Sequence, residues 1–369
     1  MIGAVRTKPQ RLVTVFGGSG FLGRYVVRAL AQRGYRIRVA VRRPDLAGRV
    51  QPLGKVGQIH AVQANLRYPA SVEHALDRAD AVVNLVGILT QRGRQTFEAV
   101  LAEGAETVAR ATRAAGASLV HVSALGADPD SASLYGRAKA QGDAAALAAA
   151  AAVFRPSVMF GPGDTFMNRF GTLARVMPVL PLVGADTRFQ PVYAADVGEA
   201  IARAVDGEVA GGRVYELGGP EVKSLAELVQ YVMTVTQRRR PIVRLSPSLG
   251  HLQARGMEIL DFLTLGFLPN ELKLTRDQVA MLQIDNVVSE AAVAEGRTLE
   301  GIGIAPTALE AVAPAYLIRF RTAGQFDANR HVFPSPAPDT IAASESAGGA
   351  RNLRPGLPPG PAVDERAAG

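Results

Sequence analysis

Three residues in the middle of the chain have types and spacing suited to acid–base chemistry. Tyr135 and Lys139 lie four positions apart, so on a helix they share one face. An ammonium beside a phenol lowers the phenol's pKa, because it stabilises the phenolate. Tyr135 can then exchange a proton with a substrate oxygen, which Ser123 would orient. We predict that Ser123, Tyr135 and Lys139 form a catalytic set.

A glycine-rich loop near the start of the chain has the spacing of a phosphate-binding loop. Gly17, Gly20 and Gly23 follow a run of strand-forming residues and open a helical pattern. The first glycine permits a tight turn, the second lets the backbone approach a pyrophosphate, and the third lets the helix pack on the strand. The helix N-terminus adds N–H groups and a positive dipole end. We predict that a dinucleotide is bound by Gly17, Gly18, Ser19, Gly20, Phe21, Leu22 and Gly23.

The residues at the end of the second predicted strand indicate which dinucleotide is bound. NAD-binding proteins carry an acidic residue about twenty positions after the glycines, where it holds the ribose hydroxyls. Here the place holds Arg42 and Arg43, and the first carboxylate is Asp45, beyond a proline. Two guanidiniums suit a 2′-phosphate. The pattern favours NADPH, and the alternative is a pair of surface arginines.

Two further loops complete the predicted cofactor site. Asn65 follows the third strand and is expected beside the adenine. Leu85, Val86 and Gly87 follow the fourth and are expected on the nicotinamide side. Tyr135 would then move a proton while hydride passes to or from the nicotinamide. Alternatively, Lys139 holds the cofactor ribose with Tyr135 packed beside it, and nothing is turned over.

The elements that must position these residues alternate between strand and helix. Apolar runs predict strands at 12–16, 35–41, 60–64, 81–86, 118–122 and 153–160. Helical spacing predicts helices at 21–32, near 71–78 and 96–115, and from about 135 to 151. This alternation is typical of an α/β fold, a Rossmann doubly wound parallel sheet. We assign residues 11–160 to this NAD(P)-binding domain.

The rest of the chain is less regular. After residues 1–10, an N-terminal extension, and the Rossmann domain, residues 161–326 are predicted to form a smaller mixed C-terminal segment. Its predicted helices lie near 194–205, 225–236, 249–262, 275–282 and 307–320. Residues 327–369 are rich in Pro, Ala, Gly and Ser, and we predict a disordered tail.

Composition excludes several classes of function. The chain has no cysteine and five scattered histidines, so we expect no metal site. The net charge is +8, yet aromatic residues make up 6% and no nucleic-acid motif occurs, so we expect no nucleic-acid partner. No signal peptide and no apolar run long enough to cross a bilayer is visible, which favours a cytoplasmic protein.

The glycine loop with Ser123 and Tyr135-x-x-x-Lys139 resembles the extended and atypical short-chain dehydrogenase/reductases. Further stretches narrow the resemblance to the alpha subcomplex subunit 9 family of respiratory complex I (NADH:ubiquinone oxidoreductase). These stretches are 155–162, 164–170, 189–197, 215–220 and 274–279. The resemblance runs from about Arg11 to Phe326.

The resemblance implies a tightly held NADPH without established turnover. It also implies that the protein binds to the peripheral arm of complex I near the quinone site, in peripheral contact with the cytoplasmic face of the inner membrane. The alternative is a free-standing NADPH-dependent oxidoreductase, or a sugar-nucleotide epimerase or dehydratase, that uses Ser123, Tyr135 and Lys139. A third hypothesis is that the protein is a regulator that senses the redox state of the cofactor.

Overall fold

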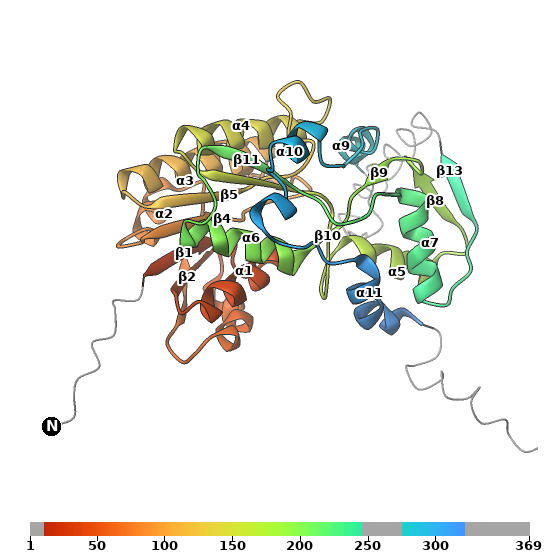
Figure 1. Cartoon of the computed structure of the whole chain (residues 1–369), viewed down its shortest axis with the longest axis horizontal. Helices are drawn as coiled ribbons and strands as arrows, with labels where there is room; N and C mark the ends of the chain where they lie inside the picture. The colour runs from red at the N-terminus through yellow and green to blue at the C-terminus, as the bar shows by residue number, and fades with distance from the viewer. Residues whose placement is uncertain (1–10, 246–274, 322–369) are drawn as a thin grey trace, which may run out of the picture. The chain divides into compact units, whose positions relative to one another are not determined.

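A seven-stranded sheet organises the amino-terminal part of the molecule (Figure 1). In the computed structural model its strand order is β11-β6-β5-β4-β1-β2-β3, and every neighbouring pair is parallel. The central strands β1, β4 and β5 are almost entirely buried, because helices cover both faces of the sheet. Their bounds are β1 Leu12–Phe16, β2 Arg36–Val41, β3 Ile59–Gln63, β4 Ala81–Asn84, β5 Ser118–Val122, β6 Ala152–Pro156 and β11 Arg213–Leu217.

Helices cover the sheet on both sides. Helices α1 (Phe21–Gln32) and α6 (Ala194–Asp206) pack on one face, in a core that contains Val26 and Ile201. Helices α2 (Pro69–Ala75), α3 (Glu103–Ala114) and α4 (Leu134–Ala148) pack on the other. The predicted Rossmann doubly wound sheet is therefore confirmed.

The order of strands reverses between β1 and β4, which creates the crevice where such sheets bind ligands. The turn after β1 and the turn after β4 meet there. A Cβ added at Gly17 would lie 3.3 Å from the carbonyl of Leu85 and from the nitrogen of Val86. The fold thus brings the glycine loop beside the residues predicted on the nicotinamide side.

Two elements of the Rossmann part differ from expectation. The strand predicted at 153–160 ends at Pro156, and Met159–Phe160 forms a separate strand, β7, which pairs with β10 (Val192–Tyr193). The helix predicted at 96–115 begins with a π-helical turn, Glu98–Ala102, before α3. The chain beyond residue 160 also supplies β11 and α6 to the Rossmann layers, and the domain boundary at residue 160 stays a prediction.

Beyond the Rossmann layers the chain forms further elements, and several of them build a second apolar core that includes Phe160, Met167 and Leu228. Strand β8 pairs with β13 in parallel, and β9 pairs with β12 in an antiparallel manner. These elements are α5 Phe166–Val176, β8 Leu180–Val183, β9 Arg188–Phe189, β12 Lys223–Ser224, α7 Leu225–Val235, β13 Ile242–Leu245, α9 Arg276–Met281, α10 Glu290–Ala294 and α11 Leu309–Leu317. Short 3₁₀ helices lie at Pro44–Leu53, Glu300–Ile302 and Ile318–Phe320.

The structure describes residues 11–245 and 275–321. The predicted extension 1–10, the predicted helix near 249–262 and the predicted tail 327–369 lie outside the described residues. Within the two described ranges, no helix is both long enough and apolar enough to span a bilayer.

Candidate nucleotide and catalytic site

The glycine loop has the tight geometry that its spacing predicts. Gly17 adopts φ +76°, a left-handed conformation that favours glycine, and its N–H donates to the Ala40 carbonyl at 3.1 Å. A Cβ added at Gly23 would lie 2.5 Å from the Gly17 oxygen and from the Gly18 carbonyl carbon. A side chain at position 23 would therefore push α1 away from the loop.

The N-terminus of α1 offers donors to an anion. Gly20 occupies the cap position, no side chain caps the helix, and its first turn holds no acidic residue. Ser19 and Gly20 are exposed. Because the first turn of a helix leaves N–H groups without intrahelical partners, this end suits a diphosphate. The residues present fit a dinucleotide.

The two arginines after β2 are exposed, and each has a protein partner. Arg42 donates to the side-chain oxygen of Gln95. Arg43 forms an ion pair with Asp45, with 2.8 Å between Nη2 and Oδ2. Each guanidinium keeps N–H donors that these partners do not use, so both could also contact a 2′-phosphate.

The other predicted cofactor residues are held by local hydrogen bonds. The Asn65 N–H donates to Ser71 Oγ at 3.0 Å, and Asn65 Oδ1 accepts the Arg67 N–H at 3.2 Å. The Leu85 N–H donates to the Phe16 carbonyl at 3.0 Å. Gly87 is exposed. Backbone hydrogen bonds thus fix the start of the turns after β3 and β4.

Ser123, Tyr135 and Lys139 lie in one buried cluster at the end of β5 and the start of α4. They are 5%, 8% and 4% exposed. Lys139 Nζ donates to the Val122 carbonyl at 3.1 Å, next to Ser123 in the chain. Asp143 of α4 is buried in the same part of the structure: burial raises the pKa of its carboxyl, and Ser123, Arg155 and Lys139 oppose that rise.

Burial changes the ionisation expected of this set. It lowers the pKa of Lys139 to about 8, and the Asp143 carboxylate opposes that fall. The pKa of the Tyr135 phenol is raised, first by burial and then by Asp143 and Asp277. The expectation that Lys139 lowers the Tyr135 pKa is therefore wrong for this structure, because burial and two carboxylates favour the neutral phenol.

Helix α9 closes over the start of α4. Asp277 accepts the Leu134 N–H at 2.6 Å and the Ser133 hydroxyl at 2.9 Å. Met281 packs against the apolar cluster that includes Tyr135 and Phe97, whose rings lie edge to face with 5.6 Å between centroids. Tyr135 is thus covered by residues that follow it by more than a hundred positions.

Several polar residues of this cluster were not predicted from the sequence. Arg155 Nε donates to Asp143 Oδ2 at 2.8 Å, and Asn84 Nδ2 lies 3.2 Å from His121 Nδ1. A signal for Asp143 was present, because it follows Lys139 at the same four-residue spacing that links Tyr135 to Lys139. No local signal pointed to Asp277.

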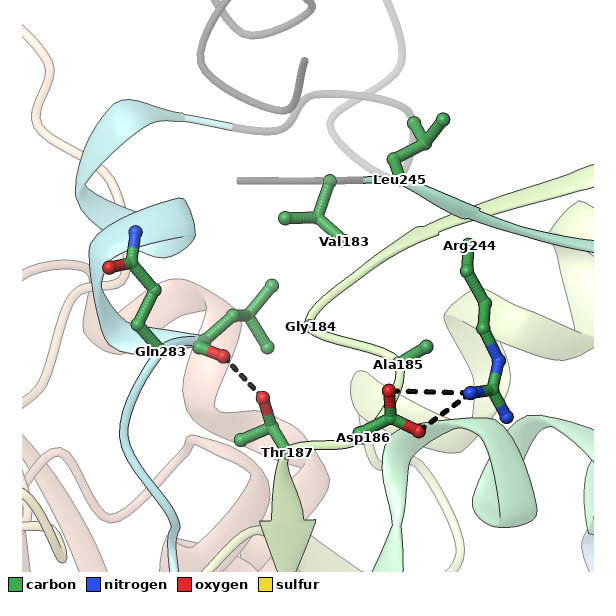
Figure 2. Close-up of a pocket in the computed structure, with 9 residues that line it drawn as sticks. Val183, Gly184, Ala185, Asp186, Thr187, Arg244, Leu245 and Gln283 are labelled. Carbon is green, nitrogen blue, oxygen red and sulfur yellow. Dashed lines mark hydrogen bonds and ion pairs between the residues drawn. The ribbon is translucent and has the colours of Figure 1, made fainter. Parts of the chain in front are cut away.

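A separate cavity of about 570 Å³ lies in the second part of the structure (Figure 2). The Thr187 hydroxyl donates to the Leu282 carbonyl at its rim, and Arg244 pairs with Asp186 at 3.0 Å. Its described lining is Val183, Gly184, Ala185, Asp186, Thr187, Arg244, Leu245, Leu282 and Gln283. None of these is a predicted cofactor or catalytic residue.

Comparison with known proteins agrees with this geometry. The model of the NAD dependent epimerase/dehydratase family matches residues 13–218, from β1 through the sheet to the end of β11. The chain belongs to this family. A nicotinamide dinucleotide is accordingly the cofactor class that the family match and the loop geometry both support.

The relatives include a subunit of NADH dehydrogenase and a ceramide reductase. The chain is 31% identical over 320 residues to NADH dehydrogenase [ubiquinone] 1 alpha subcomplex subunit 9, mitochondrial, of Arabidopsis thaliana, covering 85% of this chain and 79% of that one. It is 35% identical over 192 residues to the ceramide reductase of Caulobacter vibrioides, covering 52% of this chain and 59% of that one. The resemblance to the subunit 9 family is confirmed.

A solved structure supports the fold. NADPH-dependent quinone oxidoreductase QOR2 of Escherichia coli, complexed with NADPH, matches with a TM-score of 0.62 at 19% identity, covering 83% of this chain and 99% of that one. At that identity the match speaks for the fold alone.

Proposed function

We propose that this protein is an NADPH-holding accessory subunit that stabilises respiratory complex I or supports its assembly. The observation that carries the proposal is the extent of the similarity to subunit 9. It covers 85% of the chain, whereas the family model ends at residue 218. A likeness that continues through the second part of the chain favours a shared role, not a shared Rossmann domain alone.

NADPH is favoured over NADH by the residues at the end of β2. Arg42 and Arg43 stand where an NAD-binding protein carries a carboxylate, and both guanidiniums are exposed. A 2′-phosphate would offer Arg42 a charge-assisted bond in place of the neutral Gln95 amide, and the exposed Arg43–Asp45 ion pair is of a kind that contributes little.

A held cofactor is favoured over a consumed one by the cover on Tyr135. The phenol is 8% exposed and lies beneath α9, and its pKa is raised.

We place the subunit on the peripheral arm near the quinone site, where it contacts other peripheral-arm subunits and the cytoplasmic surface of the inner membrane.

Affinity purification of the tagged protein from native membranes tests the proposal. Peripheral-arm subunits should co-purify, and denaturing the washed complex should release NADPH. Deletion of the gene should lower NADH:ubiquinone activity in membranes. Unchanged complex I activity in the deletion strain, together with no co-purified subunit, would overturn the proposal.

A second candidate is an NADPH-dependent reductase of a carbonyl-bearing lipid. Two observations favour it: Ser123, Tyr135 and Lys139 are all present in one cluster, and ceramide reductase is among the relatives. Bound NADPH would supply a hydride to the carbonyl carbon. The Tyr135 hydroxyl would then give its proton to the carbonyl oxygen, which Ser123 orients and which leaves as an alcohol.

The Tyr135→Phe variant separates the two candidates. Under the reductase function it should abolish substrate-dependent NADPH oxidation. Under the subunit function it should leave complex I activity and retained NADPH unchanged, because Tyr135 then only packs beside Lys139. Ceramide-class lipid products that persist in the Tyr135→Phe strain would argue against the reductase.

A further inference from the structure

The excess positive charge of the chain is concentrated on one surface of its second part. This surface lies where the ends of α5 and α7 meet the 3₁₀ helix that follows α11 (Figure 1). The segments that build it, 165–185, 228–245 and 311–321, contain eight arginines and no aspartate, glutamate or lysine. The net charge of the whole chain is also +8, so the rest of the sequence is neutral overall. An arginine-rich composition alone would spread this surplus over the chain.

Hydrogen bonds to the backbone bring five of these arginines together. Three of them donate through Nε to carbonyls near the carboxyl ends of helices: Arg238 to Phe320 at 2.8 Å, Arg321 to Val235 at 2.9 Å, and Arg240 to Ala174 at 3.1 Å. Arg175 follows Ala174 in the chain, and Arg239 lies between Arg238 and Arg240. We call Arg175, Arg238, Arg239, Arg240 and Arg321 the arginine surface.

Stabilisation of helix ends accounts for only part of this arrangement. Cations stabilise the carboxyl end of a helix, and Arg238, Arg240 and Arg321 contact such ends through Nε alone. A guanidinium has five N–H donors, so the Nη donors of these three are not used by any described residue. Arg175 and Arg239 are exposed and form no hydrogen bond or ion pair within the described ranges. The arginine surface therefore offers many donors to an anionic partner outside the chain.

Apolar side chains are exposed beside the arginines. Val176 is 66% exposed and Val179 is 36% exposed. The Leu180 N–H donates to the Pro241 carbonyl at 2.9 Å, which places this stretch next to Arg240. Guanidiniums bind phosphate groups, and apolar side chains suit the boundary between lipid headgroups and acyl chains. The combination favours a lipid surface over a soluble polyanion.

We propose that the arginine surface binds the phosphate groups of anionic phospholipids, with Val176 and Val179 at the boundary of the acyl chains. The cytoplasmic leaflet of a membrane is negatively charged, and each arginine close to it strengthens binding roughly fivefold. This inference rests on the membrane contact of the proposed function, which it assigns to named residues.

Flotation of the purified full-length protein with vesicles tests the inference. Vesicles of phosphatidylcholine and phosphatidylglycerol in equal parts should retain the protein, and vesicles of phosphatidylcholine alone should not. Binding should be lost in about 1 M salt, where the Debye length is only about 3 Å. Arg175→Ala combined with Arg239→Ala should weaken binding roughly thirtyfold. The fold should survive, because neither side chain is bonded to a described residue.

Arg49→Ala combined with Arg213→Ala is the matched control. Both arginines are exposed in the Rossmann part, neither has an ion pair among the described residues, and the variant loses the same net charge. It should bind the anionic vesicles as the wild type does. Equal weakening of the two double variants would mean that net charge, not this surface, causes the binding, and would overturn the inference. A wild type that ignores anionic vesicles would also overturn it, and the surface would then suit an acidic protein.

A tryptophan reporter identifies the surface that faces the lipid. The chain has no tryptophan, so a single introduced one gives an unambiguous signal. When anionic vesicles are added, the fluorescence of Val176→Trp should shift to the blue and be quenched by brominated phosphatidylcholine. Val56→Trp, at a fully exposed valine of the Rossmann part, should show neither effect. Quenching at position 56 without quenching at position 176 would place a different surface on the lipid and contradict the inference.

Failure of this inference can be told apart from failure of the proposed function. If peripheral-arm subunits co-purify but the Arg175 and Arg239 double variant floats like the wild type, the subunit function stands and this inference is lost. If vesicles bind through the arginine surface but no complex I subunit co-purifies, the subunit function is lost and the lipid-binding surface remains.

Discussion

The glycine loop after β1 and the polar cluster on α4 lie at the same edge of the sheet, yet they are built in opposite ways. The loop uses backbone groups, it is exposed at Ser19 and Gly20, and no side chain caps it. The cluster uses ionisable side chains that are 2–8% exposed. The glycine loop is accessible to a ligand, and the cluster on α4 is covered by α9.

The difference determines what each region tolerates. The loop depends on the absence of Cβ atoms, so its function is sensitive to volume and indifferent to pH. The cluster depends on which buried groups carry charge, because an unpaired charge in the core is costly. Substitutions that add side-chain volume should therefore disturb the loop most. Substitutions that change a buried charge or remove a contact with α9 should disturb the cluster most.

Gly23→Ala should have the largest effect. Its Cβ would lie 2.5 Å from Gly17 and Gly18 backbone atoms, so α1 must move away from the loop. We expect a loss of unfolding free energy of about 1–3 kcal/mol and a loss of NADPH affinity of at least about a hundredfold, because the helix N-terminus no longer meets the phosphates. Urea unfolding and nucleotide titration measure the two effects.

Gly48→Ala is the control for that substitution. A Cβ at Gly48 meets nothing within 4 Å, and the glycine is exposed. If Gly23→Ala bound NADPH as well as Gly48→Ala does, the loop would not be the phosphate site.

Asp277→Ala tests the cover on the cluster. The variant loses the two bonds to Ser133 and Leu134 at the positive end of α4. We expect a loss of about 1–2 kcal/mol of unfolding free energy, the usual value of a helix cap, with NADPH affinity nearly unchanged. Asp130→Ala, which removes an exposed carboxylate in the loop before α4, should change neither quantity. A large fall in NADPH affinity for Asp277→Ala alone would show that loop and cluster are coupled.

The same contrast explains how much the sequence could predict. The helix Phe21–Gln32 and the strand Ser118–Val122 match their predicted bounds, because each is set by local spacing of apolar residues and glycines. The cover by α9 could not be predicted, since Asp277 follows Ser133 by 144 positions. The Tyr135 pKa was predicted in the wrong direction because burial and a distant carboxylate, not the neighbouring lysine, decide it.

Arg42→Ala should lower NADPH affinity by about tenfold and leave NADH affinity unchanged, because only NADPH carries the phosphate that the guanidinium would bind. Arg42 is exposed and bonded to Gln95, so the fold should not depend on it. Arg49→Ala removes another exposed arginine nearby and serves as the control. Equal losses for NADH and NADPH would mean that Arg42 does not distinguish the two nucleotides.

Asp45→Ala should have the smallest effect, and it should be a gain. Arg43 is held by Asp45 at 2.8 Å, and both side chains are largely exposed. Removing the carboxylate frees the guanidinium for a 2′-phosphate and removes a nearby negative charge. Because exposed ion pairs are weak, we expect a gain in NADPH affinity of only about threefold. The gain should vanish in high salt, which screens exposed charges. A loss of affinity would instead mean that Asp45 holds Arg43 in the orientation that the phosphate requires, and the open region would then also depend on a side-chain pair.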